Sequence, residues 1–233
     1  VPMLLRHLKG GSVPLGIPEN RFVWCGLPAV SSDLVKAVVA AEDVEFFRHR
    51  GFSWEQVRYS INTSIRQNRP VRAVSTISQQ CARSLFLWQG RSWIRKALEA
   101  YYTVWMELLL GKRRIMELYL NVIELGDGIY GIEAAAQHYY GKSARDLTRE
   151  EAAMLAAILP APKRWNPLQP NERVQRRQQN ILRRMEHVHL PWEPPEETAR
   201  SRAPSDASVP VQPKPEPPHE SVLATNSPSP ASP

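Results

Sequence analysis

An apolar helical run that ends in two adjacent acids constrains this chain more than any other stretch. Apolar residues recur at helical spacing over 34–41, and polar residues suited to an N-cap stand just before them. At 100° per residue, Glu42 lies about 40° around the helix from Val38, and Asp43 lies about 140° away. We therefore expect a helix over residues 32–47, with Glu42 at the edge of its core-facing stripe and Asp43 pointing elsewhere.

This position gives Glu42 two possible roles. A carboxylate at the edge of a core is partly desolvated, which raises its pKa and suits it to proton transfer near neutral pH. The same acid could instead be a helix-end residue paired with Arg48 or Arg50. Gly51 follows and is expected to end the segment, because glycine tolerates the left-handed conformation.

Composition separates the chain into a basic part and a proline-rich tail. Residues 191–233 hold 12 of the 21 prolines and few large apolar residues, so we expect a disordered tail. The tail carries six acids and three bases, so the total charge of +7 leaves about +10 on residues 1–190. A domain this basic is drawn to an anionic partner such as phosphate, an acidic lipid surface or nucleic acid.

The two cysteines and the apolar runs limit the possible kinds of fold further. Cys25 and Cys81 are too few for a disulfide framework and lack metal-ligand spacing, and Cys81 is expected to be a buried thiol. No stretch approaches the ~20 apolar residues that span a bilayer. The longest apolar runs, 104–110 and 152–159, are expected to form core helices. The chain begins with Val1 rather than methionine, which is compatible with a fragment whose anchor lies upstream.

The periodicity predicts a mostly α protein, without a β-hairpin series or an internal repeat. Residues 1–30 and 126–131 are expected to be loops, and 68–72 a basic, mobile link. The expected helices beyond the first cover residues 54–67, 76–87, 92–110, 112–125, 132–140, 149–159 and 171–187.

A polar cluster at a predicted helix N-terminus is a candidate anion site. Thr76 and Gln79 fit a capping box, and Ser75, Gln80 and Arg83 stand beside them. Free backbone N–H groups and the helix dipole at such an end favour an anion. A well-capped surface helix would explain the same residues.

A second cluster combines bases with an acid. Arg91, Arg95 and Glu99 are spaced four residues apart, so they share one face if the helix already begins at Arg91. Arg95 and Glu99 could simply pair, although an order with the base first is the weaker one. Two arginines in line with one glutamate favour a site that holds an anion beside a carboxylate.

Together these segments resemble the peptidoglycan glycosyltransferase family (family 51), and most closely its monofunctional biosynthetic members. The resemblance follows the family's order over residues 30–187. Two places depart from the family pattern: Ala73-Val74 replaces Gly-Gly or Gly-Ala, and Arg83 replaces a lysine. The matching motifs are Glu42-Asp43 with Phe46, His49 and Gly51; Ser75-Thr76-Ile77-Ser78-Gln79-Gln80; Arg95-Lys96 with Glu99; Lys112, Ile115, Glu117, Tyr119, Leu120 and Asn121; and, more weakly, Arg176-Arg177 with Ile181-Leu182.

The resemblance implies a lysozyme-like helical glycosyltransferase domain over residues 30–190 with a smaller mobile lobe, between an N-terminal segment 1–29 and the tail. It implies polymerisation of lipid II into β-1,4-linked glycan strands, with release of undecaprenyl diphosphate, at the periplasmic side of the bacterial inner membrane. The implied catalytic acids are Glu42 and Glu99. The implied substrate-binding residues are Asp43, Ser75, Gln79, Gln80, Arg83, Arg91, Arg95, Lys96 and Asn121.

The implied partners are lipid II, the growing strand, the membrane surface and other cell-wall synthesis proteins, but no nucleic acid. No cofactor is expected to be essential, although a magnesium or manganese ion could assist. A muramidase or lytic transglycosylase on the same polymer is the alternative, but a hydrolase needs no basic cluster for a lipid diphosphate. A basic binder of nucleic acid or anionic membrane is the non-enzymatic alternative, and paired carboxylates argue against nucleic acid.

Overall fold

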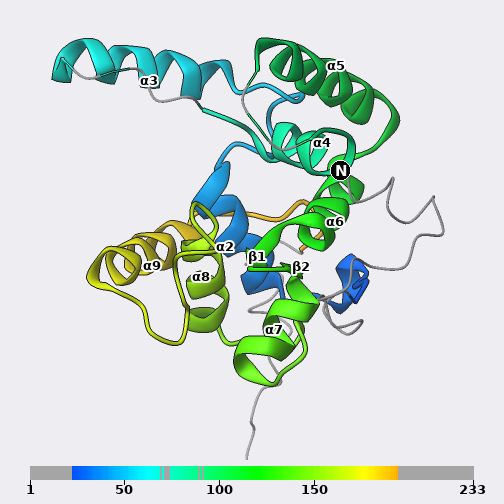
Figure 1. Cartoon of the computed structure of the whole chain (residues 1–233), viewed down its shortest axis with the longest axis vertical. Helices are drawn as coiled ribbons and strands as arrows, with labels where there is room; N and C mark the ends of the chain where they lie inside the picture. The colour runs from blue at the N-terminus through cyan, green and yellow to red at the C-terminus, as the bar shows by residue number, and fades with distance from the viewer. Residues whose placement is uncertain (1–22, 69, 71–73, 89, 91, 194–233) are drawn as a thin grey trace, which may run out of the picture. The chain divides into compact units, whose positions relative to one another are not determined.

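The computed structural model describes residues 23–68, 70, 74–88, 90 and 92–193, and this part of the chain is mostly helical (Figure 1). The expected mostly α fold class is therefore confirmed. In chain order the elements are η2 (Leu27–Ala29), α2 (Ser32–Glu42), α3 (Trp54–Gln67), α4 (Ile77–Phe86), α5 (Trp93–Leu109), α6 (Lys112–Val122), β1 (Glu124–Gly126), β2 (Ile129–Tyr130), α7 (Ile132–Tyr140), α8 (Arg149–Ile158) and α9 (Glu172–Met185).

One group of helices, α2, α8 and α9, packs together around the end of the acidic helix. Every residue of α8 from Ala152 to Ile158 is buried, so the expectation of a core helix there is confirmed. In α9 the buried residues Val174, Ile181 and Met185 recur at helical spacing, and the rest of the helix is polar apart from Leu182, which is partly buried against the core. This packing places one side of α9 against the C-terminal end of α2.

A second group is built on α4, which packs against both α5 and α6. The predicted capping box at its start is present: Thr76 Oγ1 accepts a hydrogen bond from the Gln79 amide, and Gln79 Oε1 accepts one from the Thr76 amide. Cys81 is fully buried, as expected, and both cysteines are free thiols.

Helix α2 ends at Glu42, five residues earlier than predicted. The backbone leaves the helical region at Asp43, with φ −161° and ψ 80°. The chain then turns through residues 44–50 to Gly51, whose φ of +85° is the left-handed conformation expected there. Thr76 Oγ1 donates to the Gly51 carbonyl at 2.6 Å, so this turn is fastened to the start of α4.

Helix α3 has the predicted bounds but contributes nothing to the core. None of its residues is buried, and Figure 1 shows it projecting away from α2, α8 and α9. Its apolar side chains are therefore open to solvent, with Tyr59 and Ile65 each 74% exposed. The predicted mobility of this lobe stays a prediction.

Helix α5 overturns one expectation. Residues 104–110 were expected in the core, yet α5 buries only Glu99, Thr103 and Met106. The polar side of the helix faces α4, so its apolar side is left outward. The exposed apolar residues of α5 are Trp93, Ile94, Tyr101, Val104, Trp105, Leu108 and Leu109.

A short antiparallel hairpin replaces part of the loop expected over residues 126–131. Strand β1 pairs with β2 in the register Glu124 to Tyr130 and Gly126 to Ile129. Gly128 closes the turn with φ +69°. Strands of three and two residues are too short for the alternation that reveals a strand in a sequence.

Packing continues past residue 190, where the domain was expected to end. The rings of Trp192 and Phe47 lie 5.4 Å apart, edge to face, and Lys36 forms a 2.8 Å ion pair with Glu193. The expected disorder of the tail concerns, beyond Glu193, residues outside those described. Within the described part of the chain, no helix combines the length and apolar character needed to cross a bilayer.

Candidate active site

The carboxylate of Glu42 stands at the C-terminal end of α2, with its side chain 15% exposed. Its Oε2 accepts a 2.9 Å hydrogen bond from Gln80 Nε2 on α4. Its Oε1 accepts a 2.9 Å bond from Arg177 on α9, which also donates to the Ala41 carbonyl. The expected position at the edge of the core is confirmed, and the partner of Glu42 is Arg177 rather than Arg48 or Arg50.

Opposing influences act on the ionisation of Glu42. Burial raises the pKa of this carboxyl above its ordinary value, and the neighbouring charge of Asp43 adds to that effect. The hydrogen bond from Gln80 and the charges of Arg177 and Arg83 lower the pKa, but burial outweighs them. Glu42 therefore combines fixed geometry with the raised basicity that a general base needs near neutral pH.

Asp43 is the more deeply buried of the two adjacent acids, and its contacts are structural. Its Oδ2 accepts hydrogen bonds from the Ile77 amide at 3.0 Å and from His49 Nε2 at 2.9 Å. Its Oδ1 accepts one from Gln56 Nε2 at 3.1 Å. Asp43 thus joins the end of α2 to α3 and to the first amide of α4. Its predicted contact with substrate stays a prediction.

The second acid, Glu99, lies on α5 with a fully buried side chain. Arg95 NH1 contacts its Oε2 at 3.2 Å, so the pairing along the helix does form, and Lys96 Nζ contacts Oε1. Arg83 on α4 contributes a third positive charge, 3.9 Å from Oε2. Three basic groups around one carboxylate leave a local excess of positive charge.

Arg83 connects the two acids. Its guanidinium lies 3.9 Å from the Glu99 carboxylate and is close enough to Glu42 to lower the pKa of that carboxyl. The side chain is 40% exposed, so it can reach a bound molecule. The structure therefore brings Glu42, Gln80, Arg83, Arg95, Lys96 and Glu99 into one connected site.

The other predicted site residues have different surroundings. Gln79 is nearly buried and caps α4. Asn121 is fully buried, and its amide exchanges hydrogen bonds with the Cys25 backbone at 2.8 Å. Ser75 is half-buried, and its carbonyl accepts from Gln80 Nε2 at 3.4 Å. Arg91 and Ala73 lie outside the described residues.

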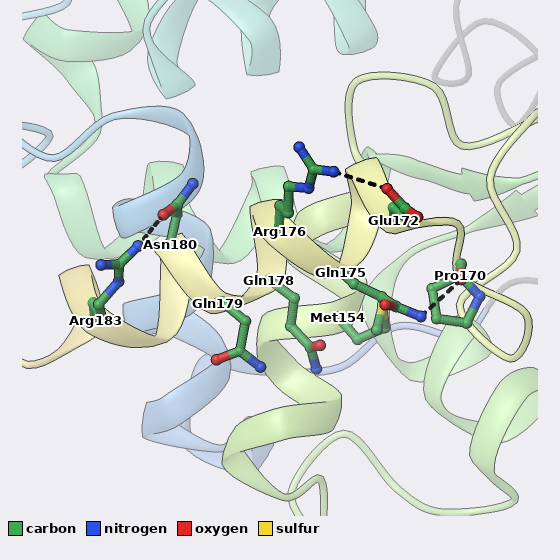
Figure 2. Close-up of a pocket in the computed structure, with 9 residues that line it drawn as sticks. All are labelled: Met154, Pro170, Glu172, Gln175, Arg176, Gln178, Gln179, Asn180 and Arg183. Atoms are coloured by element: carbon green, nitrogen blue, oxygen red, sulfur yellow. Dashed lines mark hydrogen bonds and ion pairs between the residues drawn. The ribbon is translucent and has the colours of Figure 1, made fainter.

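Arg177 is a site residue to which the sequence assigned no role beyond its place in the weak Arg176-Arg177 motif. Two other arginines of α9, Arg176 and Arg183, are exposed to solvent. Figure 2 shows them at a surface pocket of about 880 Å³ on α8 and α9, where Arg176 pairs with Glu172 at 2.8 Å. Arg177 lies on another side of α9, against Glu42. The helical period alone places it apart from Arg176, but the identity of its partner depends on the packing of α9 against α2.

The fold and the site define an enzyme of acid and base chemistry. A partly buried, basic carboxylate and a buried acid surrounded by positive charge are linked through Arg83, within a mostly helical domain. Such a site can remove a proton from one group while it stabilises negative charge that develops on another.

Comparison with known proteins gives the family. The family model described as Transglycosylase matches residues 13–186. The chain is 46% identical over 175 residues to a biosynthetic peptidoglycan transglycosylase of Shewanella oneidensis, covering 75% of each chain. It is 49% identical over 181 residues to the protein of that name in Caulobacter vibrioides (77% of this chain, 75% of the relative), and 45% identical over 186 residues to that in Xylella fastidiosa (80% and 76%). The chain belongs to the transglycosylase family, which confirms the expected family and enzyme class.

Proposed function

We propose that this chain is a peptidoglycan glycosyltransferase that polymerises lipid II into β-1,4-linked glycan strands. The proposal rests on Arg83, which lies 3.9 Å from the Glu99 carboxylate and is close enough to Glu42 to lower the pKa of that carboxyl. A base and a cationic cluster that share one arginine suit a transfer in which a hydroxyl attacks while a diphosphate leaves. The family match and the names of the relatives support the same substrate class.

In the proposed step, Glu42 accepts the proton of the 4-hydroxyl on the N-acetylglucosamine of one lipid II molecule. That oxygen attacks the anomeric carbon of the donor strand, and the bond from this carbon to the diphosphate oxygen breaks. Undecaprenyl diphosphate leaves with the bonding electron pair. Glu42 must be ionised to act, and Gln80 and Arg177 both donate hydrogen bonds to its ionised form.

The leaving diphosphate is proposed to bind the cluster of Arg83, Arg95 and Lys96. Arg83 and Lys96 are 40% and 42% exposed, so their charges are accessible, whereas Glu99 is buried behind them. Within the described structure, the Nε atom of Arg95 is buried without a hydrogen-bond partner. This donor capacity and the excess of positive charge favour a polyanionic group.

A divalent ion fits the described residues poorly. No group of three or more potential metal ligands occurs among them, and Glu99 is already surrounded by three basic side chains. A protein-held cation would be repelled there. We therefore assign charge stabilisation to the basic side chains alone.

The site is proposed to act at the outer surface of the bacterial inner membrane, because the isoprenoid chain of lipid II stays in the bilayer. The exposed apolar residues of α3 and α5 could enter the lipid. The positive charge of residues 1–190 would add attraction to anionic lipid.

Incubation of the protein with detergent-solubilised lipid II tests the proposal. Formation of glycan strands together with undecaprenyl diphosphate is expected. A parallel incubation with preformed glycan strands distinguishes the alternative, because a muramidase or lytic transglycosylase would shorten them. Salt-sensitive binding without any reaction would instead indicate a non-enzymatic binder.

A further inference from the structure

A buried tyrosine stands behind the Glu42 site. Tyr119 lies on α6 and is 1% exposed, although its hydroxyl is polar. The hydroxyl donates a 3.2 Å hydrogen bond to Gln80 Oε1. The amide at the other end of Gln80 donates at 2.9 Å to Glu42 Oε2. A chain of two hydrogen bonds therefore runs from α6 through α4 to the end of α2.

The surroundings of Gln80 allow only one orientation of its amide. Its Nε2 lies 2.9 Å from a Glu42 oxygen and 3.4 Å from the Ser75 carbonyl, and both of these are acceptors. A flipped amide would direct its oxygen at these two acceptors, where no hydrogen bond can form, so Oε1 faces the Tyr119 hydroxyl. Burial raises the pKa of Tyr119 well above its usual value, so its hydroxyl keeps its proton and can donate.

We propose that Tyr119 is a positioning residue whose hydroxyl holds Gln80 in the orientation that donates a hydrogen bond to Glu42. Tyr119 acts through Gln80 rather than on substrate, since the amide stands between its hydroxyl and the carboxylate. The inference rests on the proposed role of Glu42 as general base.

Through Gln80, Tyr119 would limit how far the pKa of Glu42 rises. The charged or titratable groups that face it are Asp43 at the end of α2, Arg83 on α4, Arg177 on α9 and Tyr119 itself. Among the influences that lower the pKa of Glu42, the hydrogen bond from Gln80 is the largest. If the hydroxyl of Tyr119 is lost, Gln80 can turn away, and the pKa of Glu42 rises further.

The test is the pH dependence of lipid II polymerisation by the full chain. In Tyr119→Phe, which removes only the hydroxyl, the acid limb of kcat/KM should move up by about half a unit to one unit. The rate at neutral pH should fall roughly three- to tenfold. Tyr139→Phe is the matched control. Tyr139 lies on α7, and its hydroxyl donates to the Leu125 carbonyl at 3.0 Å. The acid limb of this control should stay in place.

A double-mutant cycle separates positioning from a general loss of packing. Gln80→Ala should shift the acid limb as Tyr119→Phe does, and the double variant should show no further shift. Gln80 is half-buried, so this variant tests the proposal even if Tyr119→Phe folds poorly. An unmoved acid limb in Gln80→Ala, or two shifts that add, would overturn the inference. If Glu42→Gln itself polymerises at the wild-type rate, the proposed function of Glu42 fails instead.

Discussion

At the residue scale, two neighbouring carboxylates have opposite fates because the helix ends between them. Glu42 keeps the last helical position and 15% of its side chain exposed, which leaves it able to meet a substrate. Asp43 turns inward and accepts three hydrogen bonds from the protein. One acid is thus available for chemistry, and the other fixes the backbone that presents it.

Arg83 offers the first test at this scale. Arg83→Lys keeps the positive charge beside both acids, so activity should stay within about tenfold of wild type. Arg83→Ala removes a stabilising donor for the leaving group and should lower turnover by ~10²–10³. It should also move the acid limb of the pH profile upward, because the Arg83 charge lowers the pKa of Glu42.

The measurement is steady-state polymerisation of lipid II across a pH series. Arg176→Ala is the control, since that arginine is 78% exposed on the outer side of α9 and should not affect turnover. Equal activity in Arg83→Lys, Arg83→Ala and wild type would show that residue 83 does not contact substrate.

At the element scale, the turn between α2 and α3 holds the site together. Gly51 has φ +85°, and a Cβ at this position would lie 2.8 Å from Thr103 Cγ2 on α5. The same turn accepts the hydrogen bond from Thr76 at the start of α4. Gly51 therefore contacts Thr76 at the start of α4 and Thr103 on α5, the two helices that carry Arg83 and Glu99.

Gly51→Ala should lower the free energy of unfolding by about 2–3 kcal/mol, through backbone strain and the clash with Thr103. Denaturant unfolding measures this change. The control is Gly111→Ala, because Gly111 has φ −71° and open space around its Cβ position, and it should change stability by about 1 kcal/mol or less. Equal stability of both variants would contradict the packing described for the turn.

Local sequence signals predicted the elements but not the faces that they bury. The bounds of α3 and the capping box of α4 follow from short-range patterns, and the structure has them as predicted. The apolar run at 104–110 indicated a buried helix, but burial also depends on what α4 presents to α5. Because α4 faces α5 where Glu99 and Thr103 lie, the apolar side is left outside.

For the site too, the sequence predicted the position of a residue on its helix but not its partners in space. The position of Glu42 follows from helical periodicity, whereas the partnership with Arg177 joins residues 135 apart in the sequence. The link from Tyr119 to Gln80 likewise requires α6 to pack on α4. Such contacts depend on tertiary packing, which no local pattern encodes.

At the scale of the whole molecule, charge and exposed apolar surface together support the proposed action at a membrane. The full chain should bind vesicles that contain anionic lipid and lose that binding as salt rises. Replacement of Leu108 and Leu109 by serine should weaken binding by about tenfold, because these side chains are 71% and 73% exposed and could enter lipid.

Vesicle sedimentation across a salt series measures this binding. Leu168→Ser is the matched control, since Leu168 is also exposed, at 56%, but lies between α8 and α9. Undiminished binding by the Leu108 and Leu109 variant would show that α5 does not meet the lipid, and equal loss in the control would show that any exposed leucine matters.

Glu42 is the proposed general base of lipid II polymerisation. The most direct measurement compares wild type and Glu42→Gln for strand formation across pH, with thermal unfolding in parallel. Because burial raises the pKa of Glu42, ionisation disfavours the folded state, so the folded protein loses stability as pH rises from the ordinary glutamate value through the raised one. Glu42→Gln should therefore melt at or above the wild-type temperature at neutral pH.

This role predicts that the folded variant polymerises lipid II about 10²–10⁴ times more slowly than wild type, and that the acid limb seen in wild type above the ordinary glutamate pKa is absent from its profile. Strand formation by Glu42→Gln at near wild-type speed, with the acid limb unchanged, would contradict it.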